Sequence, residues 1–148
     1  MTLTEIRKKA EEGCASSQYL LGNIYTKVLY SESYGVALDK AEGVEWYRKA
    51  AEQGNAEAQN AMGYAYDTGN GVAQDYAEAV KWYKKAAVQG NAIARRNLGH
   101  CYYKGLGVRK SLYEALHWYG LEEADEEGYT AALMCRQIER EIAELEEK

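Results

Sequence analysis

The sequence Ala-Glu-Gln-Gly-Asn-Ala occupies residues 51–56 and returns, with one change, as Ala-Val-Gln-Gly-Asn-Ala at residues 87–92. A weaker version, Ala-Glu-Glu-Gly-Cys-Ala, occupies residues 10–15. The copies at 51–56 and 87–92 lie 36 residues apart. Self-similarity at such a spacing is typical of chains that stack one supersecondary unit on the next. The segment at 51–56 is therefore the junction between two copies of a repeated unit.

Further landmarks recur in the same register. The only tryptophans lie 36 residues apart, each followed by tyrosine, at Trp46, Trp82 and Trp118. A hydrophobic residue, then glycine, then tyrosine three residues later recur at 21–25, 62–66 and 98–102. Gly-x-Gly-Val recurs at 69–72 and 105–108, and the first unit keeps only Gly35-Val36.

The landmarks predict that each unit is a pair of helices, here called helix A and helix B. In the second unit helix A is expected over 55–68, and its Ala58 and Gly63 allow a neighbouring helix to approach closely. The Gly-x-Gly turn ends it, because glycine accepts the left-handed conformation that helix ends require. Asp75 caps helix B over 75–89. The apolar residues of helix B recur at helical spacing and form one stripe, at Ala79, Trp82, Tyr83 and Ala86. Neither helix can bury its stripe alone, and stacking of units solves that problem.

The chain is therefore predicted to be all-α, a solenoid of antiparallel helix pairs in one domain over 1–148. Its parts are expected to be an N-terminal helix at 1–12, repeat 1 at 13–53, repeat 2 at 54–89, repeat 3 at 90–124 and a C-terminal capping helix at 125–148. The helices are expected over 3–12, 15–28 with 39–53, 55–68 with 75–89, 91–104 with 111–124, and 128–146. Thr2 and Glu5 have the spacing of a capping box. In the last helix an apolar stripe is expected to face the array, at Leu133, Met134, Ile138, Ile142 and Leu145.

The composition excludes several classes of function. The net charge is −5, and residues 122–148 carry ten acidic and three basic residues, a net of −7. No concentrated basic surface for nucleic acid is expected. Three cysteines without CxxC spacing argue against a disulfide framework or a zinc site. No cofactor and no membrane insertion are expected. The absence of an apolar leader at Met1 predicts a cytoplasmic location, or a periplasmic or secreted one if a signal peptide was removed.

These motifs closely resemble the Sel-one-like repeat, a family related to the tetratricopeptide repeats. The stretches that carry the resemblance are 51–59, 62–66, 69–72, Asp75 and Lys81-Trp82-Tyr83-Lys84-Lys85-Ala86-Ala87. The resemblance covers roughly residues 10–124. Residues 125–135 resemble the degenerate start of a fourth repeat. The resemblance implies a right-handed α-solenoid with a concave groove and a role as an adaptor, scaffold or partner-binding protein.

The chain departs from the repeat pattern in three places. The first unit carries five extra residues within 26–35. Arg95 stands where the other units have Gln18 and Gln59. The third helix B ends in Gly-Leu-Glu-Glu at 120–123, where the second has Lys-Lys-Ala-Ala at 84–87.

Residues that vary between units are the candidates for function, since the recurring ones build the fold. Positions 6, 10 and 13 after the glycine that precedes each helix A share one helix face. Because related repeats line their groove with helix A, the resemblance places these residues in the groove as candidate partner-binding residues: Tyr19, Asn23, Thr26, Asn60, Tyr64, Asp67, Arg96, His100 and Tyr103. Tyrosine, arginine and asparagine suit protein recognition, although an ordinary solvated face is the alternative.

The loop over 26–38 is the second candidate surface. Loops often carry function, but a longer surface loop also costs little and can simply be tolerated. The Trp-Tyr doublets could stack on sugars or bases, yet their constant register favours core packing.

Catalysis is not expected, because no nucleophile elbow, phosphate loop or dinucleotide motif is present. The neighbouring side chains of His100 and Cys101 point about 100° apart on a helix, which disfavours a shared metal. The leading hypothesis is a module that binds a peptide or helix of a protein partner in its groove. The alternatives are a dedicated inhibitor of one partner, such as a bacterial immunity protein, a hydrolase, or self-association through the last helix. A monomer is otherwise expected.

Overall fold

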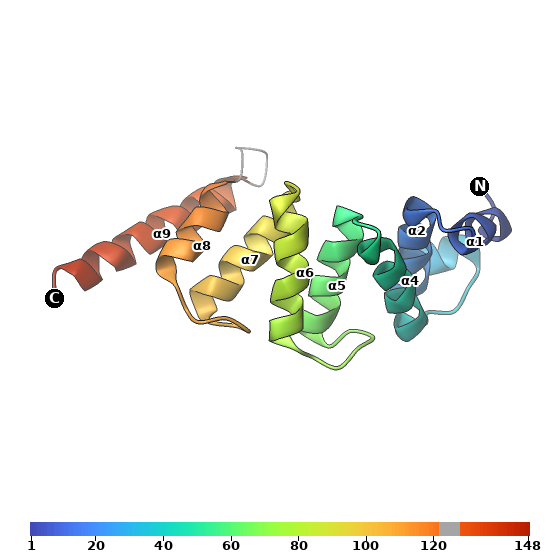
Figure 1. The fold of residues 1–148 in the computed structure, drawn as a ribbon, viewed down its shortest axis with the longest axis horizontal. Helices are drawn as coiled ribbons and strands as arrows, with labels where there is room; N and C mark the ends of the chain where they lie inside the picture. The colour runs from blue at the N-terminus through green and yellow to red at the C-terminus, as the bar shows by residue number, and fades with distance from the viewer. Residues whose placement is uncertain (122–127) are drawn as a thin grey trace.

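A computed structural model describes residues 1–121 and 128–148, with side chains described for 1–121 and 131–148. The described residues form helices and no strand. The helices are α1 (Leu3–Glu11), α2 (Ala15–Thr26), α3 (Val28–Tyr34), α4 (Lys40–Glu52), α5 (Ala56–Thr68), α6 (Tyr76–Val88), α7 (Ala92–Lys104), α8 (Leu112–Gly120) and α9 (Gly128–Glu146). They follow one another along the long axis, with the two termini at opposite ends (Figure 1). The predicted all-α solenoid is confirmed.

Helix pairs are the packing unit of this array. Within units α2 packs on α4, α5 on α6 and α7 on α8, whereas α4 on α5, α6 on α7 and α8 on α9 join one unit to the next. Side-chain caps start several of the helices: the Asp75 carboxylate accepts from the Glu78 amide, and the Thr2–Glu5 capping box forms. Gly69 ends α5 with a φ of 70°, as the Gly-x-Gly motif predicted.

Glycine and tyrosine form the close contact inside each unit. A Cβ atom added to Gly63 would lie 2.4 Å from the Tyr83 ring, and one added to Gly22 would lie 2.3 Å from the Tyr47 ring. The α5 backbone therefore touches the Tyr83 ring directly, as the sequence predicted for a close helix approach.

The second glycine of Gly-x-Gly has a role that the sequence did not reveal. A Cβ atom on Gly71 would lie 2.5 Å from the carbonyl oxygen of Lys40, and one on Gly107 would lie 2.3 Å from that of Tyr76. Each turn thus packs on the first turn of the preceding helix B, so the motif joins units as well as ending a helix.

The Trp-Tyr doublets lie in the core, as predicted. Tyr83 is fully buried, and Trp82 packs with Val44 and Met62 in the seam between the first two units. Trp118 occupies the next seam, whereas Trp46 is only half-buried. Trp82 and Trp118 are too deeply buried for a sugar or base to stack on them.

A ladder of polar side chains crosses the seams between units. Gln18 donates to the carbonyl of Ala10, and Gln59 donates to that of Ala51. Gln53 and Gln89, at the ends of α4 and α6, donate to the two ladder glutamines at 2.7 and 2.8 Å. In the third unit the single side chain of Arg95 takes the place of such a glutamine pair. Its guanidinium donates to the carbonyls of both Ala87 and Leu121.

Several sequence expectations need correction. The segment expected to be a loop contains α3, and α2 ends at Thr26 rather than 28. α8 ends at Gly120, before the predicted 124, and the predicted boundary at 125 lies outside the described residues. In α9 the predicted stripe is wrong at two positions: Leu133 and Leu145 are exposed, while the inward residues are Ala131, Met134, Cys135, Ile138 and Ile142. Leu133 lies about 160° around the helix from Ala131, on the side away from the buried face, whereas Leu145 lies in line with Ile138 but at the end of α9.

Candidate functional site

A groove of about 460 Å³ lies along the helices A of the three units. α2 supplies one wall, α5 the centre and the first two turns of α7 the other wall, while Val44 and Tyr47 of α4 contribute to its floor. We call this hollow the groove, and its lining includes Tyr19, Asn23, Lys27, Asn60, Tyr64, Ile93 and Asn97.

Five of the predicted residues line the groove. They are Tyr19, Asn23, Thr26, Asn60 and Tyr64. These residues lie on the side of α2 and α5 that faces the groove, and their partner-binding role stays a prediction.

The other four predicted residues do not line this hollow. Asp67 accepts a hydrogen bond from the Tyr83 hydroxyl at 2.9 Å, which ties it to the core. Tyr103 donates to Glu141 at 2.5 Å and accepts from Gln137 at 3.0 Å, so α9 covers its hydroxyl. The remaining two, Arg96 and His100, lie on α7 beyond the groove lining; Arg96 is half-buried and His100 exposed.

A fixed hydrogen-bond network forms the floor at the first unit. The Tyr47 hydroxyl donates to Asn23 Oδ1 at 2.8 Å and lies 2.9 Å from the Thr26 hydroxyl. Burial raises the pKa of Tyr47 to about 12, so the phenol keeps its proton and its donor role into alkaline pH. Asn23 is thereby locked as a structural group rather than a free ligand contact.

The accessible part of the groove combines apolar and amide groups. The side chains of Tyr64 and Ile93 are each 53% exposed although they stand inside a hollow. Asn97 donates to Asn60 Oδ1 at 3.3 Å, joining the amides of α7 and α5. Lys27 and Glu57 are the charged members of the lining, and they carry opposite signs. This surface suits hydrogen bonding and apolar contact with a peptide rather than binding of a charged polymer.

Sequence reasoning missed several groove residues. Glu57 and Ile93 stand three residues after the glycine that precedes their helix A, and Asn97 stands seven after it. Positions 3 and 7 flank positions 6 and 10 on the same helix face, so a wider face would have included them.

Comparison with known families explains this arrangement. The Sel1 repeat model matches three consecutive segments, at 15–55, 56–91 and 92–121.

The chain belongs to the Sel1 repeat family.

Solved structures of other Sel1 proteins agree with this assignment. A Sel1 repeat protein from Oxalobacter formigenes is 35% identical with a TM-score of 0.75, and the match covers 82% of this chain and 88% of that one. The protein c5321, a protective antigen of uropathogenic Escherichia coli with an SLR fold, is 40% identical with a TM-score of 0.75. That match covers 82% of this chain but 25% of c5321. No curated protein matches.

A more distant structure shares the fold alone. Cysteine rich protein B of Helicobacter pylori is 22% identical with a TM-score of 0.59, and the match covers 79% of this chain and 85% of that one.

Sel1 repeat proteins are typically protein-interaction modules. None of the helices described here has the length and apolar character needed to cross a membrane.

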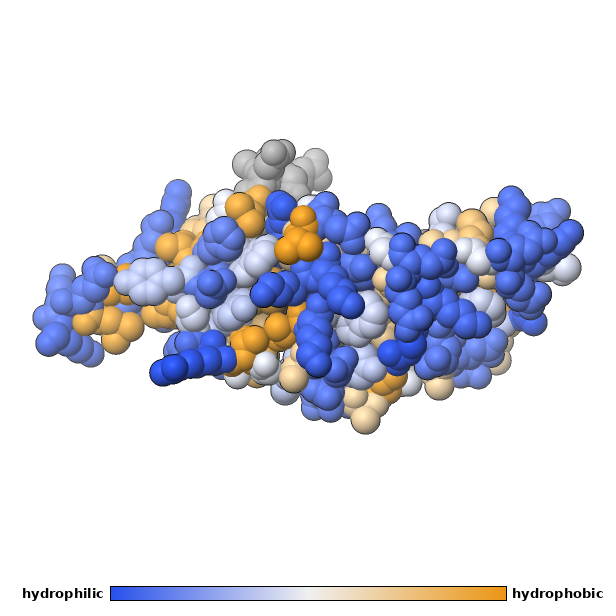
Figure 2. Space-filling model, viewed as in Figure 1, coloured by the Kyte–Doolittle hydropathy of each residue, from blue (hydrophilic) through white to orange (hydrophobic). Residues whose placement is uncertain are grey.

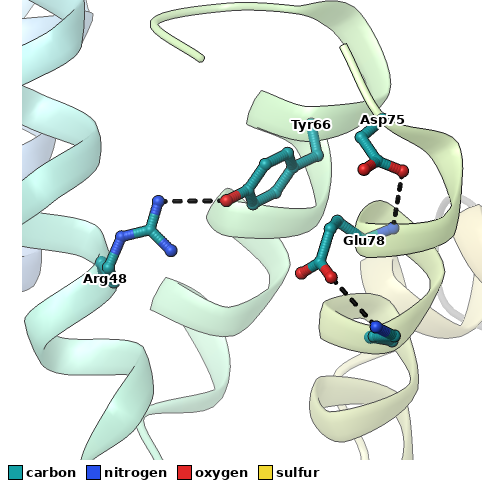
Figure 3. Close-up of polar contacts among 5 residues, drawn as sticks. Arg48, Tyr66, Asp75 and Glu78 are labelled. Atoms are coloured by element: carbon teal, nitrogen blue, oxygen red, sulfur yellow. Dashed lines mark hydrogen bonds and ion pairs between the residues drawn. The ribbon is translucent and has the colours of Figure 1, made fainter. Parts of the chain in front are cut away.

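Polar contacts outside the groove serve the Sel1 array itself. The Arg48 guanidinium of α4 donates to the Tyr66 hydroxyl of α5 at 3.1 Å (Figure 3). Beside it, Asp75 caps α6 and Lys81 pairs with Glu78 at 3.0 Å (Figure 3). Arg7 donates to the Tyr25 hydroxyl in the same way, so this tyrosine links α2 to α1 as Tyr66 links α5 to α4.

Two of the cysteines outside the groove have shifted pKa values, in opposite directions. Cys101 is buried, and this burial raises its pKa to about 12. Cys14 is exposed before α2, and hydrogen bonds from Ser17 and Ser16 lower its pKa to about 7. No group of three histidine, cysteine or acidic residues could hold a metal among the described positions.

Proposed function

We propose that this chain is a protein-interaction module whose groove holds a segment of a partner protein. The observation that supports it most is the exposure of Tyr64 and Ile93 inside a concave surface, beside the amides of Asn60 and Asn97. Large side chains left half-exposed in a hollow lose more water contact on binding than they would on a flat surface.

The shape of the groove favours a peptide or a single helix. It is about 460 Å³ and is lined by side chains of three successive helices A, so a short segment of chain fits it better than a domain surface does. The near balance of charge in the lining implies recognition by hydrogen bonds and apolar side chains.

The test uses a random peptide library. We expect the full chain, immobilised, to enrich members of a 15-residue phage-displayed library. Synthetic copies of those peptides should then bind the chain in a fluorescence polarisation assay.

Two variants with matched chemistry locate the site. Tyr64→Ala with Ile93→Ala removes a tyrosine and a branched aliphatic residue from the groove. The control variant, Tyr113→Ala with Val88→Ala, removes a tyrosine and a branched aliphatic residue that lie outside the groove. Each of these two residues is 65% exposed. We expect Kd to rise at least about tenfold, or roughly 1.4 kcal/mol, in the groove variant only. Equal affinity in the two variants, or failure of the chain to enrich any peptide, would contradict the proposal.

A further inference from the structure

The inserted helix α3 is an ordered part of the first unit. Its Ser31 is buried and donates to the carbonyl of Val28 at 2.9 Å. Tyr34 and Val36 pack against the first core cluster, and Gly35 ends the helix with a φ of 65°. One side of α3 therefore anchors it, which a merely tolerated loop would not need.

The first turn of α3 presents apolar side chains to solvent. Val28 is 56% exposed, Leu29 74% and Tyr30 36%, and the three are consecutive. We call them the α3 ledge. Side chains that stay this exposed add little to the stability of the fold. Consecutive exposed apolar residues on an ordered helix mark an interaction surface. The second and third units connect their helices by Gly-x-Gly-Val, so the ledge belongs to the first unit alone.

Lys27 joins the ledge to the groove. It belongs to the groove lining, and its Nζ lies 5.9 Å from the centre of the Tyr30 ring. In the described part of the chain no carboxylate lies within 4.0 Å of this ammonium group. The edge of the groove thus offers a cation beside apolar surface.

We propose that the α3 ledge and Lys27 form a second contact for the partner segment that the groove holds. That segment presents large apolar side chains to Val28 and Leu29 and an acidic side chain to Lys27. The ammonium group supplies the charge complementarity, and the ledge supplies apolar area beyond the groove. This inference rests on the proposed function, because it extends the same binding site at one end.

The first experiment removes the apolar area. Peptides enriched by the unaltered chain are measured against Val28→Ser with Leu29→Ser. The matched control is Val88→Ser with Leu145→Ser, which lie 65% and 61% exposed elsewhere. We expect Kd to rise at least tenfold for the ledge variant and less than twofold for the control. Circular dichroism melts should coincide, since all four side chains are exposed.

The second experiment reverses the charge. Lys27→Glu, panned against the same library, should lose the acidic residue that the unaltered chain selects and select a basic residue in its place. The inference is overturned if the unaltered chain selects no acidic residue, or if the ledge variant binds every selected peptide as well as the control does.

The groove variant separates the two proposals. Binding that is lost in Tyr64→Ala with Ile93→Ala but kept in the ledge variant overturns this inference and leaves the proposed function standing. Binding that survives in the groove variant overturns the proposed function itself.

Discussion

Contact between glycine and tyrosine sets the spacing of the two helices in each unit. The Tyr83 ring lies where a side chain on Gly63 would have to be, so even a methyl group must displace the ring. Gly63→Ala should therefore lower the free energy of unfolding by about 1–3 kcal/mol, measured by urea denaturation. Gly120→Ala is the control, because a Cβ atom there meets nothing within 4 Å and alanine favours the helix. A Gly63→Ala chain as stable as the Gly120→Ala chain would refute this contact.

The indole of Trp82 fills a seam between units, so its loss should leave a cavity. Trp82→Ala should cost about 3–5 kcal/mol of stability, and Trp46→Ala, at a half-buried position, should cost less. Thermal melts followed by circular dichroism compare the two. An unchanged melting temperature in Trp82→Ala would show that the seam assignment is wrong.

The cysteines should differ sharply in reactivity. Because hydrogen bonds lower the pKa of Cys14 to about 7, a large share of its thiol is ionised at neutral pH. Cys14 should therefore be alkylated by iodoacetamide well before Cys101, whose burial raises its pKa to about 12. Ser17→Ala, which removes the largest of the causes that lower the Cys14 pKa, should slow labelling at pH 7. Mass spectrometry of timed samples gives both rates, and equal rates for the two thiols would contradict these assignments.

Residue roles were predictable from the sequence only where they repeat. The register of tryptophan and tyrosine predicted burial, and helix-face spacing placed Tyr19, Asn60 and Tyr64 in the groove. Asp67 and Tyr103 share that face, but their oxygens bond to Tyr83 and to α9. Such pairings depend on which residues stacking brings together, and sequence spacing does not encode them.

At the scale of elements, helix starts were predictable because capping residues mark them. Asn55, Asp75 and Asn91 each accept a backbone hydrogen bond at the start of a helix. The short helix α3 has no such side-chain cap, and a helix of seven residues carries too little periodicity to be recognised. Its order depends on packing of Tyr34 and Val36 against the first core cluster.

The glutamine ladder gives a prediction about the junctions between helices. Gln59 satisfies the buried carbonyl of Ala51 at 3.2 Å and accepts from Gln89. Gln59→Ala should cost about 1–3 kcal/mol, since it removes two part-buried or buried hydrogen bonds, one to Ala51 and one from Gln89, while the Gly54 amide still donates to the Ala51 carbonyl. Gln74→Ala, which removes an exposed glutamine bonded to the carbonyl of Asp67, is the matched control for urea denaturation. If the two variants lost similar amounts of unfolding free energy, the glutamine ladder would not stabilise the junctions between units.

At the scale of the whole molecule, the array has a groove along its helices A and a largely hydrophilic surface in the view of Figure 2. α9 closes the far end, with Ile138 buried against α8 and charged residues on its outer side. A terminal element with a polar outer face is what a short solenoid needs to remain soluble.

The central claim is that this groove binds a partner segment. The most direct measurement is a heteronuclear NMR titration of the isotopically labelled chain with a peptide enriched from the library. We predict that the largest shifts fall on amides of α2, α5 and the first turns of α7, around Tyr19, Asn60, Tyr64 and Asn97. Shifts that concentrate on α4, α6 and α8 instead, with the groove amides unmoved, would contradict it.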